Sequence, residues 1–233
     1  MHTLKSILKF IFRFIISIFV NFLTKSKTQY NSKLSLDVLK QVFQKKIKCN
    51  FGSAYISGNV EIHNNVTLYN QLEIFGNIEL SKNVSISGPG TRICSSINNI
   101  SIGSYCSIAS NVIIQEYNHN PDLITTYDIC ENILKLKNPN SRTSKGSIII
   151  EEDVWIGSNS VILSGVKIGR GSIIGSGSIV TKDILPYSIA VGNPCKRIKS
   201  RFNQNKIDEL ESLKWWEWDE NKLIKNKDIF YER

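Results

Sequence analysis

Aliphatic residues recur at every sixth position in two long stretches of this 233-residue chain. Neither the 3.6-residue period of an α-helix nor the two-residue alternation of a strand produces this spacing. The chain must therefore turn after every six residues, and an internal repeat of this kind is typical of a solenoid. The two runs, with a shorter one between them, are Ile56, Ile62, Leu68, Ile74, Leu80 and Ile86; Ile102, Ile108 and Ile114; and Ile150, Ile156, Ile162, Ile168, Ile174 and Val180.

Each six-residue unit predicts one short strand and one corner. A second apolar or small residue follows most of the aliphatic positions four residues later, and Gly and Asn gather between them, where the chain needs tight bends. Three units close a triangular coil, and successive coils stack by parallel β-pairing about 4.8 Å apart. Between Ile86 and Ile102 the phase slips by four residues, which predicts one irregular coil.

The limits of the period define the expected organisation. The repeat covers 50–201, and a loop over 115–147 interrupts it. A long interruption on a rigid scaffold is typical of a functional loop. We therefore expect a basic helical arm over 1–49, a β-solenoid over 50–201 and a helical tail over 202–233, with a helix at about 205–225.

The net charge of +9 is concentrated near the N-terminus. Residues 1–50 carry ten basic residues and one acidic residue, whereas residues 51–233 carry 19 of each. Despite a pI near 9.3, a neutral body with one basic segment argues against a nucleic-acid partner.

The basic arm combines apolar residues with a charged stripe, because Lys5, Lys9 and Arg13 follow at spacings of four. Its longest uncharged run, 14–24, is too short for a membrane span, which needs about 20 residues. One interpretation is an interfacial helix that binds an anionic membrane surface through residues 1–30, and the other is a helix docked on protein. The first predicts a cytoplasmic protein peripheral to the inner face of the membrane.

Five cysteines without a CxxC pair argue for a reducing compartment and against a disulfide scaffold or zinc ribbon. Cys106 occupies the apolar ladder and Cys94 lies in the irregular coil, so packing explains both better than nucleophilic chemistry does. Only His63 and His119 lie outside the basic arm, and His63 should face solvent. Three imidazole ligands for zinc cannot be assembled from them, so we expect no metal.

Several segments resemble the hexapeptide-repeat acyltransferase superfamily. Ile156–Val161 and Ile174–Ile179 resemble its repeat, and Ser178–Ile184 followed by Gly192–Ile198 resembles its terminal coil. The resemblance covers roughly 50–201. It implies a left-handed parallel β-helix, a homotrimer with active sites between subunits, and acetyl-CoA as cosubstrate. Periodicity alone establishes neither the handedness nor the oligomeric state.

Transfer of an acyl group from a thioester to a hydroxyl needs a base for the acceptor's proton, and imidazole suits this because its pKa of about 6.5 lies near working pH. The resemblance places the catalytic base at His119, where the loop starts, with Tyr117, Asn118 and Trp155 as substrate-binding neighbours. Glu116 or a backbone carbonyl would orient the imidazole, although a plain surface charge is the simpler interpretation of Glu116.

The same resemblance implies the contacts with coenzyme A. Glycine-rich corners let a pantetheine arm approach the backbone closely, and basic side chains suit its phosphates. The expected contacts are Ser158, Ser176, Thr181 and Lys182, with Lys196 and Lys199 on the phosphates and Arg197 and Arg201 nearby. A solvated basic turn is the alternative for the basic cluster.

The combined prediction is an acetyl-CoA-dependent O-acetyltransferase that acts on a sugar hydroxyl of a surface polysaccharide or its precursor. The tail, with Trp215, Trp216 and Trp218, resembles xenobiotic acetyltransferases, so acetylation of chloramphenicol or a streptogramin stays open. N-acetylation of a nucleotide-linked amino sugar stays open too. The indoles should cap a prism end or pack on another subunit. The alternative from another class is a non-enzymatic β-solenoid, which would need no lone histidine in a loop.

Overall fold

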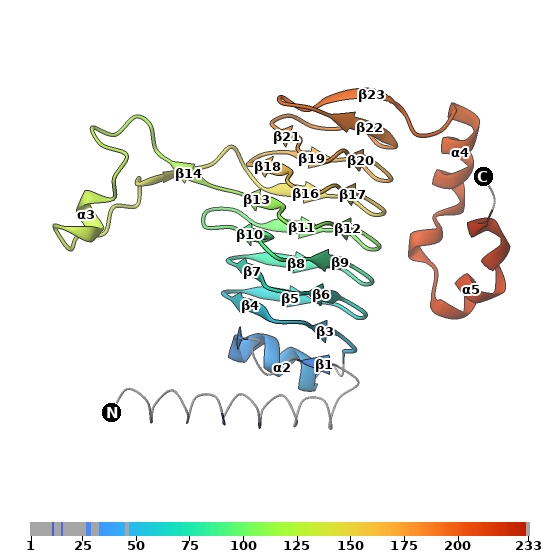
Figure 1. The fold of residues 1–233 in the computed structure, drawn as a ribbon, viewed down its shortest axis with the longest axis horizontal. Coiled ribbons are helices and arrows are strands. Elements are labelled where there is room, and N and C mark those ends of the chain that lie inside the picture. The colour runs from blue at the N-terminus through green and yellow to red at the C-terminus, as the bar shows by residue number, and fades with distance from the viewer. Residues whose placement is uncertain (1–10, 12–14, 16–26, 29–32, 45–46, 232–233) are drawn as a thin grey trace.

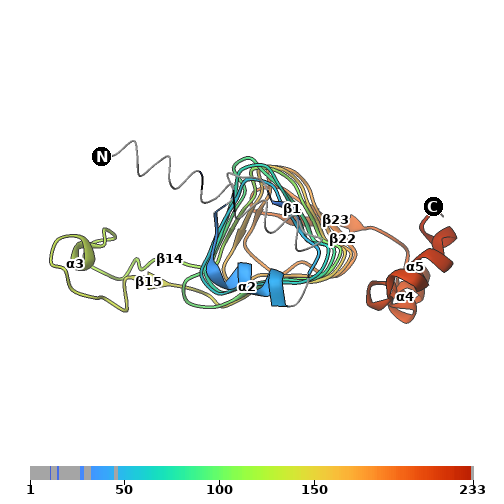
Figure 2. The same ribbon diagram turned by 90° about the horizontal axis from the view of Figure 1, so that it is seen from below.

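The chain folds into a three-sided prism with a projecting loop on one side and a helical tail on the other (Figure 1). This computed structural model describes residues 11, 15, 27–28, 33–44 and 47–231. The predicted basic helix of the N-terminal arm therefore lies almost entirely outside the described residues. Seen from the N-terminal end, the coils overlie one another as a triangle (Figure 2). The predicted β-solenoid is confirmed.

Three sheets, here called A, B and C, form the sides of the prism. Sheet A contains β1 (Lys27–Thr28), β3 (Asn50–Phe51), β6 (Thr67–Tyr69), β9 (Ser85–Ser87), β12 (Ser107–Ile108), β17 (Trp155–Ile156), β20 (Ile173–Ile174), β22 (Ser188–Val191) and the antiparallel β23 (Lys196–Ser200). Sheet B contains β2 (Lys33–Leu34), β4 (Ala54–Ser57), β7 (Leu72–Phe75), β10 (Arg92–Cys94), β13 (Ile113–Gln115), β18 (Val161–Leu163) and β21 (Ile179–Val180). Sheet C contains β5 (Val60–Ile62), β8 (Ile78–Leu80), β11 (Ile100–Ile102), β16 (Ile148–Ile150) and β19 (Lys167–Ile168).

The predicted aliphatic ladders fill the interior of the prism. The chain passes from sheet B to C to A in each coil and climbs as a left-handed β-helix (Figure 2). In regular coils the partners are 18 residues apart, as in the pairs Ile56 with Ile74 and Ile156 with Ile174. Every residue of the three predicted runs is buried. Since full burial of such a side chain contributes roughly 1.5–3 kcal/mol, these ladders are the main source of the prism's stability.

The predicted irregular coil is also confirmed. Ile74 pairs with Ile93, 19 residues later, and Ile78 pairs with Ile100, 22 residues later, where a regular coil would have 18. One additional residue thus lies at the A–B corner. The other three lie at the B–C corner, between Cys94 and Ile100, and we call residues 95–99 the inserted turn.

A short helix, α2 (Leu36–Gln44), closes the N-terminal end of the prism (Figure 2). Its Val38 and Val42 side chains are fully buried. The Gln41 side chain hydrogen-bonds to the edge strand of sheet C. Its amide donates to the Val60 carbonyl at 2.8 Å and accepts from the Ile62 N–H at 3.1 Å. Paired in this way, the sheet edge offers no free strand to a neighbouring chain.

The chain leaves the prism at the B–C corner after Gln115, one residue later than expected, and residues 116–147 form the projecting loop (Figures 1 and 2). Its two legs are β14 (Asn118–His119) and β15 (Arg142–Thr143), which pair antiparallel, and α3 (Ile129–Asn132) lies farther out. The loop is therefore a two-stranded extension of the prism.

The tail consists of α4 (Gln204–Leu213), η1 (Trp215–Glu217), α5 (Glu220–Lys225) and η2 (Lys227–Phe230). Lys214 adopts a left-handed conformation with φ of 46° and ends α4, so the single helix expected at about 205–225 is broken there. Trp216 and Trp218 are buried, and they contact Arg170 and Lys82 on the side of the prism rather than at its end. The predicted end cap is wrong, because the side chains that receive the indoles line the C–A corner. No helix of the described part of the chain is long and apolar enough to cross a membrane.

Candidate active site

His119 stands exposed on the outgoing leg of the projecting loop. It pairs across the hairpin with Arg142, whose guanidinium lies 4.8 Å from the centre of the Tyr117 ring. Arg142 also donates to the Ser96 hydroxyl at 2.7 Å. The imidazole is therefore open to solvent, while the strand that carries it is tied to the prism.

Glu116, the first residue after Gln115 ends β13, is fully buried and lies at the root of this loop. Its carboxylate accepts the Ser96 N–H at 3.0 Å, the Ile97 N–H at 2.9 Å and the Asn98 side-chain amide at 2.8 Å. Burial alone would raise the pKa of the Glu116 carboxyl, but the hydrogen bonds from these groups and from Ser144 outweigh burial and lower that pKa. Interpreting Glu116 as a surface charge is therefore wrong, because the inserted turn encloses it.

Trp155, the proposed neighbour of the base, lies on the outer face of sheet A. It pairs with Ser107 on one side and Ile173 on the other, and its side chain is 52% exposed. The projecting loop leaves from the B–C corner, on the opposite edge of sheet B from the A–B corner. One copy of the chain does not bring His119 and Trp155 together.

Ser158 and Ser176 occupy the A–B corners of successive coils. The Gly177 N–H donates to the Ser158 carbonyl at 2.8 Å, so the two corners stack directly. Gly157 has to be glycine, because a Cβ there would lie 2.7 Å from the Ser176 nitrogen. At Gly177, whose φ is +73°, a Cβ would have no atom within 4 Å, so this corner is open to a ligand that approaches the backbone.

The remaining residues predicted to contact coenzyme A lie near the C-terminal end of the prism. Thr181 and Lys182 follow β21, and Lys196 and Lys199 lie on β23. The three lysines are exposed, and none forms an ion pair with an acidic side chain of the described residues. The predicted set is thus divided among the A–B corner, the B–C corner and the last strand, and all three places are on the surface.

Comparison with known proteins identifies the family. A profile described as bacterial transferase hexapeptide (six repeats) matches residues 147–182. A probable macrolide acetyltransferase of Lysinibacillus sphaericus is 41% identical over 134 residues, which cover 55% of this chain and 74% of that protein. The chain belongs to the hexapeptide-repeat transferases.

The chain is also similar to other acetyltransferases and acyltransferases. The chloramphenicol acetyltransferase of Escherichia coli is 36% identical over 128 residues, 52% of this chain and 61% of that protein. The chain thus spans about three fifths of the chloramphenicol acetyltransferases that it matches. A mutant of AntD, an N-acyltransferase from Bacillus cereus, has a TM-score of 0.45 and 20% identity, with 82% of this chain and 88% of that chain covered.

The four buried cysteines of this hexapeptide-repeat transferase are poor nucleophiles. Burial raises the pKa of Cys106 to about 12 and that of Cys49 to about 11. Burial also raises the pKa values of Cys94 and Cys195. Within the described residues, no group of three or more His, Cys, Asp or Glu side chains is arranged to hold a metal ion.

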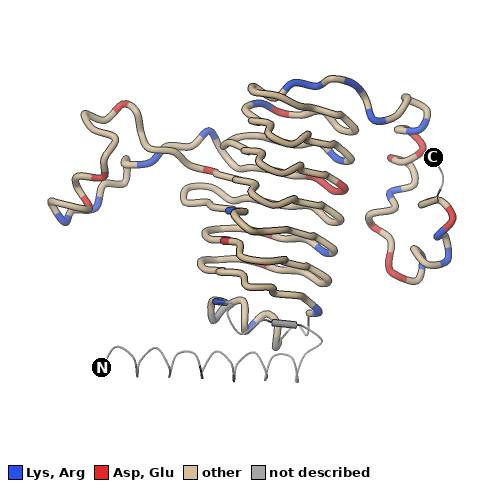
Figure 3. Tube along the Cα trace, in the orientation of Figure 1, with Lys and Arg blue, Asp and Glu red and all other residues tan. Residues whose placement is uncertain are grey.

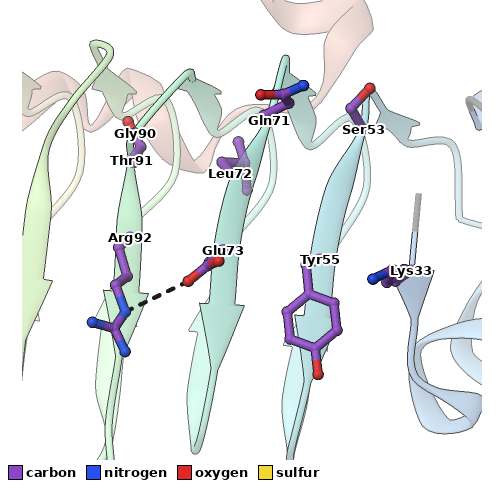
Figure 4. A pocket seen from close by; sticks show the side chains of 9 residues that line it. All are labelled: Lys33, Ser53, Tyr55, Gln71, Leu72, Glu73, Gly90, Thr91 and Arg92. Carbon is purple, nitrogen blue, oxygen red and sulfur yellow. Dashed lines mark ion pairs between the residues drawn. The ribbon is translucent and has the colours of Figure 1, made fainter. Parts of the chain in front are cut away.

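Sequence reasoning missed a groove of about 700 Å³ on sheet B (Figure 4). Lys33 lies 5.7 Å from the centre of the Tyr55 ring, and Arg92 pairs with Glu73 at 3.6 Å. These residues occupy the same outward position in successive strands of sheet B. The six-residue repeat alone could therefore have predicted that they lie side by side. The groove reaches β10, the strand next to β13, from which the projecting loop leaves. Its lining is Lys33, Ser53, Tyr55, Gln71, Leu72, Glu73, Gly90, Thr91 and Arg92.

Proposed function

We propose that this chain is an acetyl-CoA-dependent O-acetyltransferase with His119 as its general base. The observation that carries the proposal is the exposed imidazole on a loop whose root is fixed to the β-helix of a hexapeptide-repeat transferase. The names of the matched relatives, which are acetyltransferases, support acetyl transfer as the reaction.

The acceptor hydroxyl attacks the thioester carbonyl while its proton passes to a ring nitrogen of His119. A carbon–oxygen bond forms and the carbon–sulfur bond breaks. The departing thiolate then takes the proton back from the imidazolium, and a backbone N–H stabilises the oxyanion. This direct transfer needs no acyl-enzyme, in agreement with the raised pKa values of the buried cysteines.

The donor fits the stacked corners and the basic end of the prism. The open corner at Gly177 gives a pantetheine arm access to backbone groups beside Ser158 and Ser176. Thr181 and Lys182 extend this path. Lys196 and Lys199, which form no ion pair within the described residues, supply charge for phosphates.

The site is proposed to be shared between copies in a homotrimer. This follows from the separation of His119, on the B–C corner, from Trp155 and Ser158, on sheet A and its corner. A loop from one copy then meets the corner of its neighbour. The exposed apolar side chains of the loop support such a contact, because no other described residue covers them; they include Ile124, Ile133, Leu134 and Leu136.

Mixing two inactive variants tests the shared site. His119→Ala and Trp155→Ala should each be inactive or nearly so. Refolded together, random trimers should regain about one quarter of wild-type activity, because that share of loop–corner pairs is intact on both sides. Each variant refolded alone is the control. No recovery in mixtures that sediment as trimers would contradict a site made from two copies.

For the acceptor we propose a sugar hydroxyl of a surface polysaccharide or its precursor. The groove on sheet B supports this choice, since an aromatic ring flanked by charged and amide side chains suits a hydroxyl-rich chain (Figure 4). It also lies on the sheet from which the projecting loop leaves.

A second candidate acceptor is the hydroxyl of an antibiotic. It is favoured by the 36% and 41% identity to chloramphenicol and macrolide acetyltransferases. Release of coenzyme A should be measured with acetyl-CoA against surface glycans, free sugars, chloramphenicol and a macrolide. Turnover of glycans alone supports the first acceptor, and turnover of antibiotics alone replaces it with the second. A lack of turnover with every acceptor would contradict the proposed function.

The basic segment 1–30, which lies mostly outside the described residues, is proposed to hold the enzyme at an anionic membrane surface near its acceptor. Sedimentation with vesicles containing anionic lipid tests this. Replacing Lys5, Lys9 and Arg13 by Gln should abolish binding, and binding that survives these changes would contradict it.

A further inference from the structure

The projecting loop touches the prism mainly at its root, so the position of His119 depends on how that root is held. We infer that Glu116 is a positioning residue, whose carboxylate fixes the direction in which the loop leaves the prism. The inference rests on the proposed role of His119 and adds a residue that acts through it.

The Glu116 carboxylate joins the outgoing leg of the loop to the inserted turn. It accepts two consecutive backbone N–H groups, from Ser96 and Ile97, and its side chain is fully buried. A buried carboxylate needs several donors, and successive N–H groups of a tight turn supply them. The three additional residues of the inserted turn therefore supply the donors that the Glu116 carboxylate needs.

The returning leg is joined to the same turn through Asn98. Its amide donates to Glu116 at 2.8 Å and to the Ser144 hydroxyl at 3.1 Å. Ser144 in turn accepts the Gly146 N–H at 3.0 Å, just before the chain re-enters the prism. One carboxylate and one amide thus connect both legs.

A second brace ends on the same turn. Arg142, opposite His119 in the hairpin, donates to the Ser96 hydroxyl and stacks on Tyr117. His119 lies three residues beyond Glu116 and directly opposite Arg142, so both braces act on the strand that carries it. A small rotation at Glu116 would therefore displace the imidazole.

The place of the insertion agrees with this role. The inserted turn and the projecting loop occupy the B–C corner in successive coils, because Cys94 and Gln115 end paired strands. The corresponding corners of the next two coils, at Ser164–Gly165 and Lys182–Asp183, carry no excursion. The additional residues occur directly beneath the loop that has to be held.

The substitution Glu116→Gln tests the inference because it keeps the shape and removes the charge. One of the two carboxylate oxygens becomes an N–H donor that faces other donors. We expect kcat to fall about 10- to 100-fold, since reacting groups displaced by about 1 Å lose rates of this order. The KM for acetyl-CoA should change less than about twofold, because the proposed donor contacts lie on other corners or, for Thr181 and Lys182, two coils beyond the loop. Amide exchange should accelerate at Ser96 and Ile97 and through the loop.

Glu151→Gln is the matched control. Its carboxylate also accepts a backbone N–H, from Arg170 at 2.8 Å, but at the C–A corner. This variant should leave kcat and loop exchange unchanged. Asn98→Ala, which keeps the charge of Glu116, should show a smaller version of the same defect and serves if Glu116→Gln fails to fold.

Amide hydrogen exchange and turnover together distinguish a failure of this inference from a failure of the proposed function. Unchanged loop exchange in Glu116→Gln overturns the inference, and so does faster exchange with unchanged kcat. A fall in donor affinity equal to the fall in kcat also overturns it, since general damage would then explain both. If wild-type enzyme acetylates no acceptor, the proposed function fails, and loop exchange alone decides whether Glu116 holds the loop.

Discussion

The projecting loop and the tail both extend beyond the six-residue repeat, yet they relate to the prism in opposite ways (Figure 1). The loop stands away from the B–C corner and is fastened at its root. The tail folds back along the C–A corner of its own chain (Figure 2).

The tail is fastened at several coils. Glu211 of α4 accepts from Arg170 at 2.9 Å and from the Tyr187 hydroxyl at 2.8 Å, and the Arg170 guanidinium lies 4.3 Å from the centre of the Trp216 ring. Farther along, Lys82 donates to the Trp218 carbonyl at 3.1 Å. These contacts connect corners from coils far apart on the prism.

The loop and the tail also differ in how deeply their apolar side chains are buried. Trp216 and Trp218 of the tail are buried, whereas Ile124 and Leu136 of the loop are exposed. The tail therefore buries these two indole rings within its own chain and stabilises the prism. The loop leaves apolar surface free and is suited to meet another molecule. The distribution of charge distinguishes them little, since both regions carry acidic and basic residues (Figure 3).

The largest expected effect comes from the loop. His119→Ala should lower turnover at least about 100-fold, because general-base catalysis contributes that much or more. Thermal unfolding should be unchanged, since the side chain is exposed. The control is His63→Ala, which removes an imidazole near Glu79 on sheet C. Near-normal turnover of His119→Ala in an acceptor assay would reject the base.

A substitution in the tail should lower stability and leave turnover nearly unchanged. Trp216→Ala should destabilise the protein by about 3 kcal/mol, the usual scale for removing a buried aromatic ring, while turnover per folded molecule stays near normal. Urea denaturation followed by circular dichroism measures the loss. Ile224→Ala, which truncates a tail residue that is 63% exposed, should change stability by less than about 0.5 kcal/mol. Equal losses in both variants would mean that the tail is not fastened through Trp216.

The repeat made most of the prism predictable. Inward positions such as Ile56 and Ile162 follow from a period of six, because only one orientation of each coil buries them. The slip after Ile86 correctly indicated an irregular coil. The position of His119 at the start of the loop was likewise readable from the sequence.

Side-chain partners across the fold were not predictable in this way. The burial of Glu116 depends on Ser96 and Ile97, about 20 residues away, and a period gives no information about which corner meets which carboxylate. The docking of the tail depends on Arg170 and Tyr187, which sit at ordinary corner positions in the sequence. Such contacts require the register of distant coils to be known first.

A smaller effect concerns the pH dependence of stability at the root of the loop. Because its folded-state pKa is lowered, Glu116 contributes stability that is fully present above its unfolded pKa and is lost as pH falls through its folded pKa. The difference in melting temperature between wild type and Glu116→Gln should be constant at pH 6–7 and shrink on acidification below about pH 4, near the ordinary Glu pKa. Glu131→Gln, an exposed carboxylate of the same loop, should show no such trend. A difference in melting temperature that grows as the pH falls would contradict the lowered pKa of Glu116.

The smallest expected effect concerns the thiols, which differ between the projecting loop and the prism. Cys130 lies half-exposed on the projecting loop, and the other four cysteines are buried in the prism. A thiol-blocking reagent should therefore label one cysteine per native chain and all five after denaturation. Direct transfer requires no thiolate, so turnover of the labelled enzyme should stay within about twofold of the untreated enzyme. Loss of activity that follows labelling of Cys106 or Cys94, measured by mass spectrometry of digests, would contradict direct transfer. Loss that follows Cys130 alone, and disappears in Cys130→Ser, would instead show that the reagent displaces a loop that must meet its neighbour closely.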